Sequence, residues 1–162
     1  MPAGPGGRRR AESPPDFLTM AIRYLARAER TASQVERYVQ AKGASPAQGH
    51  AVVRELERRG YLNDQAYADR WAESRLWRRP MGRERLKLEL LGRGFEDKVA
   101  ERALDLAYRS ISEQEFACRA LEGRRTSMRP LQWVRFLRQR GFDDDTIQQV
   151  TQVDLETGLD EL

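Results

Sequence analysis

One helix end occurs three times in the sequence, as "RYVQAKGAS" (37–45), "LELLGRGFE" (88–96) and "RFLRQRGFD" (135–143). In each copy a bulky apolar residue stands four positions before a glycine and another stands eight positions before it, which is the spacing of one helical face. The glycines follow one another at intervals of 51 and 47 residues (43 to 94 and 94 to 141). This self-similarity predicts a structural repeat of about fifty residues. The six apolar residues are Val35, Val39, Leu86, Leu90, Trp133 and Leu137.

Helix start signals divide each repeat further. "TASQ" (31–34), "SPAQ" (45–48) and "SEQE" (112–115) each match a capping box, in which a Ser or Thr caps the helix and a Gln or Glu follows three residues later. Strand signals are nearly absent, so three helices fit each repeat and neighbouring repeats must stack to bury their faces. The predicted fold is all-α, an elongated and curved array of three tandem three-helix repeats with about nine helices. The expected boundaries are a disordered basic tail (1–15), repeats at 16–64, 65–110 and 111–152, and an acidic tail (153–162).

The composition excludes several classes of protein. A single cysteine, Cys118, and a single histidine, His50, leave no disulfide framework and no zinc site. We find no catalytic set, no phosphate-binding glycine loop and no cofactor motif, so we expect neither an enzyme nor a bound cofactor or metal. No apolar run is long enough to span a membrane, and the first 15 residues have no apolar core of a signal peptide. The cytoplasm is the expected compartment.

Charge is distributed unevenly along the chain. The net charge is +4, but residues 119–140 hold seven Arg against one acid, whereas the 22 residues from Gly141 onward hold seven acids and no Lys or Arg. Such polarity is typical of proteins that dock on an anionic or strongly patterned partner. An ordinary solvated surface gives similar totals, so charge alone does not decide between the two.

The fourth expected helix, in "YADRWAESRLWRR" (67–79), has two distinct faces. On a helical wheel, Tyr67, Trp71 and Leu76 fall on the arc of a core face, together with two alanines. Trp77 falls on the polar side, between Glu73 and Arg70, so it either fills a gap against a neighbouring repeat, the favoured interpretation, or is an exposed anchor for a partner.

Two groups of cations are candidate contacts for phosphate or for an acidic protein surface. Neither group shows the interleaved aromatic residues of a stacking platform for single strands. The first group is Arg75, Arg78, Arg79, Arg83, Arg85 and Lys87, and the second is Arg119, Arg124, Arg125, Arg129, Arg135 and Arg138.

The stretch "GYLND" (60–64) stops one helix and starts the next within five residues. Gly60 favours the left-handed turn that closes a helix, Asn63 supplies a capping oxygen, and Asp64 places a negative charge at the positive end of the following helix. We expect this segment to set the angle between the first and second repeats. Exposure of Tyr61 to a partner is the alternative role.

With these motifs in hand, the sequence resembles the RecX family, the bacterial regulators of the RecA recombinase. The resemblance extends from about Phe17 to Val150 and rests on the order and spacing of "GYLND", "SR" at 74–75, "GRERLKLELLGRGF" (82–95) and "RFLRQRGFDDDTI" (135–147). One departure lies in the first repeat, where "AQGH" stands in place of the apolar residue that Val99 and Ile147 provide in the others.

The resemblance implies a modular, all-helical regulator without catalytic activity. Members of the family bind the RecA–DNA filament in its helical groove and modulate strand exchange and ATP hydrolysis, mainly by inhibition, within DNA recombination, repair and the SOS response. The expected partners are thus the RecA filament and, weakly and non-specifically, single- and double-stranded DNA, with the protein itself a monomer. The alternative is a sequence-independent DNA-binding protein that competes with RecA for DNA.

Overall fold

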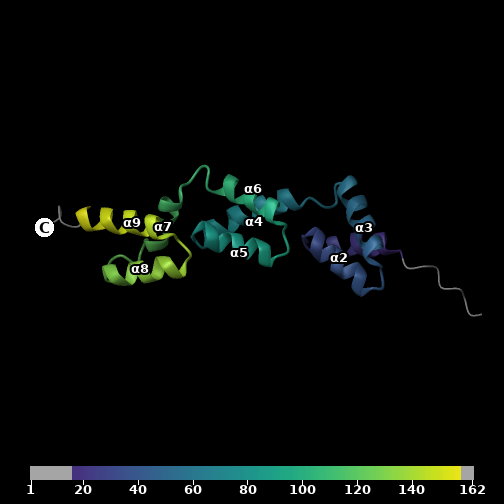
Figure 1. The fold of residues 1–162 in the computed structure, drawn as a ribbon, viewed down its shortest axis with the longest axis horizontal. Helices are drawn as coiled ribbons and strands as arrows, with labels where there is room; N and C mark the ends of the chain where they lie inside the picture. Colours follow the sequence, from purple (N-terminus) through teal and green to yellow (C-terminus); the bar gives the residue numbers. More distant parts are fainter. Residues whose placement is uncertain (1–15, 158–162) are drawn as a thin grey trace, which may run out of the picture.

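The computed structural model describes residues 16–157, with side chains described up to Gln152. Within that range the chain forms nine α-helices and no strand. Figure 1 shows them in an elongated row, with the helices up to α3 at one end, α4 to α6 in the middle and α7 to α9 at the other end. The predicted all-helical repeat array is therefore confirmed. The helices are α1 (Phe17–Leu25), α2 (Ala32–Ala41), α3 (Pro46–Arg58), α4 (Asp64–Arg78), α5 (Arg83–Gly92), α6 (Asp97–Ala107), α7 (Glu113–Leu121), α8 (Pro130–Gln139) and α9 (Asp144–Thr157).

The helices pack in three groups, which we name repeat 1 (α1–α3), repeat 2 (α4–α6) and repeat 3 (α7–α9). The most extensive contacts between helices fall within these groups: α2 packs on α3, α4 on α6, and α7 on α9. The last helix continues to Thr157, past residue 153, where the acidic tail was expected to begin. The tail predicted over 1–15 and the end of the acidic tail, 158–162, lie outside the described residues.

The local signals in the sequence fold as predicted. All six apolar residues before the repeated glycines are buried, and the three glycines have positive φ angles of 103°, 93° and 76°, a region that favours glycine. Thr31, Ser45 and Ser112 each accept a hydrogen bond from the backbone N–H three residues on, and both halves of each capping box are present. The predicted caps and helix ends are therefore confirmed.

The apolar core is divided in two along the row. Repeat 1 encloses a cluster of its own, with Val35, Val39 and Leu56 fully buried. Repeats 2 and 3 share a single cluster, in which Leu76 of α4, Leu104 of α6 and Phe116 of α7 belong to the same core. Burial of apolar area is the main stabilising contribution to packing, so repeats 2 and 3 form one body and repeat 1 another.

Repeats 2 and 3 meet through closely packed backbone. The Gly82 N–H donates to the Arg140 carbonyl at 3.0 Å, and a Cβ at Gly82 would lie 1.8 Å from the Gly141 carbonyl oxygen. Because Gly82 has an ordinary φ of −75°, glycine is required there by space and not by conformation.

One acidic residue at each junction accepts a backbone N–H from the neighbouring repeat. Asp64, the first residue of α4, accepts from Ala32, the first residue of α2, at 2.9 Å. Glu113, the first residue of α7, accepts from Arg83, the first residue of α5, at 3.0 Å. Burial raises the pKa of both carboxyls, the backbone hydrogen bonds opposing it. The role predicted for "GYLND" thus has a physical basis, since Asp64 ties repeat 2 to repeat 1.

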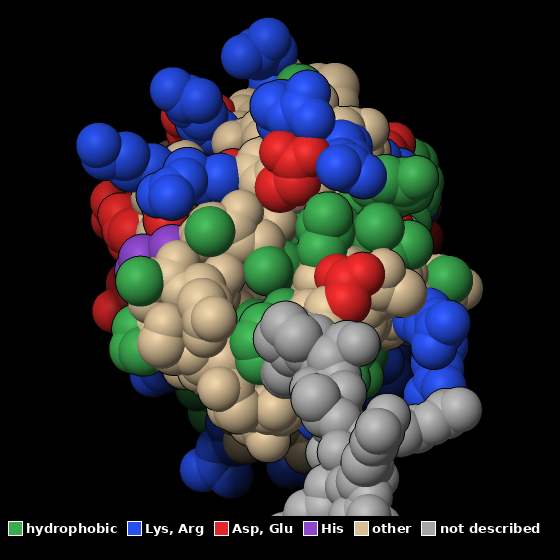
Figure 2. All heavy atoms as spheres, turned by 90° about the vertical axis from the view of Figure 1, so that its right-hand side faces the viewer, with side chains coloured by type: hydrophobic (Ala, Val, Ile, Leu, Met, Phe, Trp, Pro, Cys, Tyr) green, Lys and Arg blue, Asp and Glu red, His purple; other side chains and the backbone are tan. Residues whose placement is uncertain are grey.

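The departure "AQGH" in repeat 1 forms the first turns of α3. Gly49 is buried there, and a Cβ at this position would lie 3.1 Å from the Glu36 side chain of α2. A small residue therefore lets α3 approach α2 closely where repeats 2 and 3 use an apolar side chain. His50 beside it lies 2.7 Å from the Glu36 carboxylate. Figure 2 looks onto this end of the molecule, where basic side chains gather along the upper edge.

Candidate interaction surface

The first predicted group of cations does not form one patch, because several members are held by carboxylates. Arg75 on α4 donates from Nε and Nη2 to the two carboxylate oxygens of Glu89 on α5, at 2.6 and 3.0 Å. This two-point contact raises the pKa of Arg75 and lowers that of Glu89. Arg85 reaches the same carboxylate from α5, with its Nε at 3.5 Å.

Arg83 and Lys87 lie on the side of α5 that faces α6. Arg83 bonds Asp105 at 2.6 Å and Glu101 at 3.2 Å, while Lys87 contacts Glu101 and Asp97. The hydrogen bonds from these two cations lower the pKa of Glu101. This network joins α5 to α6, so these two predicted contacts already have intramolecular acidic partners.

Four of the predicted cations, drawn from both groups, gather where repeats 2 and 3 meet, around Arg140. Its Nη1 donates to the Pro80 carbonyl at 3.0 Å across the junction. Burial lowers the pKa of Arg140, and four nearby guanidinium groups lower it further. We call this group the arginine surface: Arg75, Arg79, Arg85, Arg124 and Arg140.

An aromatic ring lies inside the arginine surface. The guanidinium carbons of Arg124 and Arg140 lie 5.1 and 4.8 Å from the Phe136 ring centroid. Like-charged side chains brought together without equal numbers of acids create a strongly positive potential, which favours an anionic ligand. Among residues 16–152, neither Arg79 nor Arg124 has a carboxylate within ion-pair distance.

Other predicted cations have surroundings of their own, although Arg78 shares one depression with Arg75 of the arginine surface. Arg78 donates to the Ser74 carbonyl at 3.2 Å and lines a depression between α4 and α5. Arg135 and Arg138 line a shallow depression on α8 beside the exposed Leu131, and Arg138 pairs with Asp144 at 2.8 Å. Arg125 and Arg129 are exposed in the α7–α8 connection and at the start of α8.

Trp77 is not buried between repeats, which corrects the favoured interpretation of its role. Its side chain is 51% exposed, and the Arg119 guanidinium from α7 lies 3.9 Å from the ring centroid. The ring therefore contacts repeat 3 on one side and is open to solvent elsewhere. The predicted core face of α4 does face the core: Ala68, Ala72 and Leu76 are buried there, and Tyr67 and Trp71 are partly buried against the core of repeats 2 and 3.

Sequence reasoning missed Arg140, which lies at the centre of the arginine surface. The sequence feature that could have indicated Arg140 is its position directly before Gly141, because the backbone there packs against Gly82 of repeat 2.

The exposed Tyr61, at 55%, lies in a depression between repeats 1 and 2 with Leu25 and Arg70. Within residues 16–152 no three His, Cys, Asp or Glu side chains are arranged to hold a metal ion.

The described helices include none that is both long and apolar enough to cross a bilayer. Together the repeated three-helix units define an all-α helical-repeat protein.

Comparison with known proteins identifies the family. Residues 63–104 match the model of the second three-helix domain of RecX. The chain is 32% identical over 138 residues to the regulatory protein RecX of Treponema pallidum (strain Nichols), covering 85% of this chain and 84% of that one. It is 31% identical over 134 residues to the regulatory protein RecX of Halorhodospira halophila, covering 78% and 81%. The chain therefore belongs to the RecX family of regulatory proteins.

The fold agrees with this assignment. The crystal structure of RecX from Lactobacillus salivarius superposes with a TM-score of 0.74 at 24% identity, covering 86% of this chain and 95% of that one. A second RecX crystal structure superposes with a TM-score of 0.67 at 16% identity, covering 85% and 74%. At these identities the likeness shows that the fold is shared.

Proposed function

We propose that this chain binds the RecA–DNA filament in its helical groove and modulates the recombinase, mainly by inhibiting strand exchange and ATP hydrolysis. The chain belongs to a family of regulatory proteins. The partner, the RecA–DNA filament, follows from the role that the resemblance to this family implies. The single observation that supports a filament contact most is the arginine surface, where five guanidinium groups gather at the junction of repeats 2 and 3. In this proposal they contact filament phosphate or acidic loops, and the protein acts in the cytoplasm without chemistry of its own.

The elongated row of repeats supports the same proposal. A row of three units (Figure 1) is a shape that touches more than one filament protomer at once, and linked contacts raise the overall affinity through effective concentration. The other exposed cations, Arg78, Arg125, Arg129, Arg135 and Arg138, would form additional contacts along the groove. Arg83 and Lys87 would contribute less, because their acidic partners must be displaced first.

The test is the ATPase activity of RecA on single-stranded DNA, titrated with this protein well below the RecA concentration at two salt levels. Inhibition at strongly substoichiometric amounts that survives added salt would support specific engagement of the filament. Inhibition only near saturation, lost as salt rises, would instead indicate competition for DNA, because phosphate binding weakens steeply with salt.

A further inference from the structure

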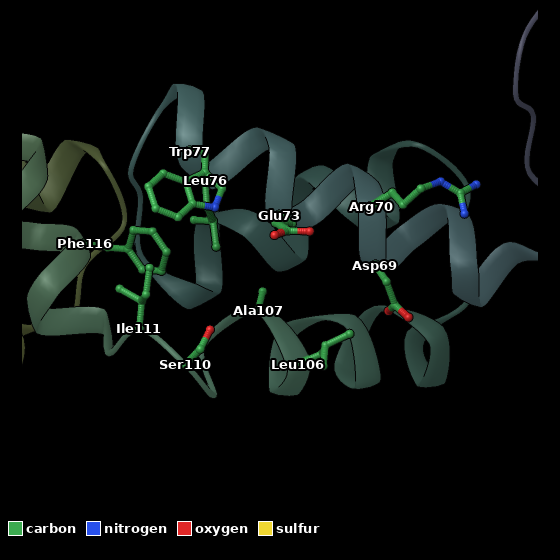
Figure 3. A pocket seen from close by; sticks show the side chains of 10 residues that line it. All are labelled: Asp69, Arg70, Glu73, Leu76, Trp77, Leu106, Ala107, Ser110, Ile111 and Phe116. Atoms are coloured by element: carbon green, nitrogen blue, oxygen red, sulfur yellow. The ribbon is translucent and has the colours of Figure 1, made fainter.

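A hollow of about 320 Å³ lies between α4, α6 and the start of α7, and it is lined mainly by apolar side chains. Leu76 and Phe116 are buried beneath it, whereas Trp77 and Leu106 are 51% and 46% exposed at its edges. Figure 3 shows the tryptophan and phenylalanine rings at one end and Leu106 on the opposite wall. Two large, half-exposed apolar side chains beside one hollow are typical of a protein-binding surface.

The rim of the hollow is acidic. Glu73 and Asp69 project from α4 into the gap that separates α4 from α6 (Figure 3). Glu73 is exposed and forms no ion pair within residues 16–152, while Asp69 accepts a hydrogen bond from the Gln65 amide at 2.8 Å. Two cations lie nearby and both are engaged: Arg70 bonds Glu29 of repeat 1, and Arg119 lies over the Trp77 ring. A partner group that approaches this rim gains most if it is a lysine or an arginine.

The hollow is also well fixed in shape. Its walls come from repeats 2 and 3, which share one apolar core. Arg119 lies against one side of the Trp77 ring and holds it over the hollow. A preorganised pocket loses less conformational entropy on binding, and this smaller cost increases the affinity for a partner.

We propose that this hollow docks an apolar side chain with a neighbouring lysine or arginine, presented by the protein component of the filament. The inference rests on the proposed function and adds a second contact to it, separate from the arginine surface. Arg75 pairs across to α5, whereas Trp77 and Glu73 line the hollow toward α6, so the two surfaces lie on different sides of α4. The acidic rim disfavours phosphate. In this proposal the arginine surface therefore contacts DNA, and the hollow contacts the recombinase.

The experiment measures binding of the full chain to two probes: a RecA filament assembled on single-stranded DNA, and the same DNA without RecA. Two variants test the hollow from opposite walls, Glu73→Lys on α4 and Leu106→Ser on α6. Both positions are exposed, and a thermal melt followed by circular dichroism checks the fold of each. The matched control is Glu57→Lys, an exposed glutamate of repeat 1 whose replacement changes the net charge equally.

We expect each hollow variant to weaken filament binding about tenfold, a typical effect for a central contact. Binding to bare DNA should stay within about twofold for Leu106→Ser and rise slightly for Glu73→Lys, while Glu57→Lys should bind the filament like wild type. Unchanged filament binding in both variants, or equal losses on filament and bare DNA, would overturn the docking site and leave the proposed function standing. A wild-type chain that does not bind the filament would instead overturn the proposed function, and this site with it.

Discussion

The two junctions of the array use the same polar contact and differ in what surrounds it. At both, the acidic first residue of one repeat's leading helix accepts the first N–H of the second helix of the repeat before it: Asp64 for Ala32, and Glu113 for Arg83. At the second junction a shared apolar core and close backbone packing reinforce this bond. At the first, the described core clusters do not cross, and polar contacts connect the repeats.

The charges at the junctions differ as well. The depression beside Gly94, at the first junction, is lined by the acids Glu36, Glu57, Asp64 and Glu96 together with His50 and Arg54. The arginine surface lies beside Gly141, at the second. We infer that the same backbone contact occurs in two settings. The second junction is cationic and more rigid, whereas the first is acidic and opens more easily. We therefore expect repeat 1 to change its angle to repeat 2 more easily than repeat 3 does.

Closing the space between repeats 2 and 3 should produce the largest effect. In Gly82→Ala the new Cβ would lie 1.8 Å from the Gly141 carbonyl oxygen, with an ordinary φ, so the whole cost is steric. We expect a loss of roughly 2–3 kcal/mol in the free energy of unfolding, measured by urea titration, and a fall of about 5–10 °C in Tm.

The control for this change is Gly43→Ala in repeat 1. Its φ of 103° is strained for alanine, but nothing lies within 4 Å of a Cβ there. Backbone strain alone should cost about 1–2 kcal/mol. If Gly82→Ala cost no more than this control, the second junction would be looser than the packing of Gly82 on Gly141 indicates.

Removing the acidic residue at each junction should affect the shape of the molecule differently at the two junctions. Asp64→Ala and Glu113→Ala each leave one backbone N–H without its acceptor, at a cost of about 1 kcal/mol in stability. Hydrogen exchange should accelerate at Ala32 in the first variant and at Arg83 in the second. Small-angle scattering should show a changed overall shape only for Asp64→Ala, because the shared core keeps repeats 2 and 3 together. A change of shape in both would remove the proposed difference in rigidity.

Neutralising the second junction should weaken nucleic-acid binding more than stability. In the pair Arg79→Gln and Arg124→Gln, two exposed guanidinium groups of the arginine surface are lost. The slope of log affinity for single-stranded DNA against log salt should fall by about 1.4, or 0.7 for each contact. The matched pair Arg27→Gln and Arg54→Gln, exposed in repeat 1, should leave the slope unchanged. Equal slopes for the two double variants would mean that DNA binding depends on the total positive charge and not on the arginine surface.

Much of this architecture was predictable from the sequence, because it depends on residues close together in the chain. Caps such as Ser45, helix-ending glycines such as Gly94, and the burial of Leu90 follow from spacings of three to eight residues. The candidate surface was less predictable because it depends on how repeats stack. Lys87 meets Glu101 only once α5 packs on α6, and Arg140 joins Arg79 only once repeat 3 packs on repeat 2.

The smallest effect concerns pH. Burial raises the pKa of Asp64 above its usual 3.8, so the folded chain holds this proton more tightly than the unfolded chain. Its contribution to the free energy of unfolding therefore falls as pH rises from about 3.8 to the raised pKa, and is constant above it. In Asp64→Asn the amide oxygen still accepts the Ala32 N–H without titrating. The stability of this variant relative to wild type should increase with pH across that window, as measured by urea titration at several pH values. Glu113→Gln should behave alike. If the relative stability instead falls with rising pH, the ionised carboxylate gains more from its hydrogen bond to the backbone N–H than it loses through burial of its charge. The negative charge would then stabilise both junctions.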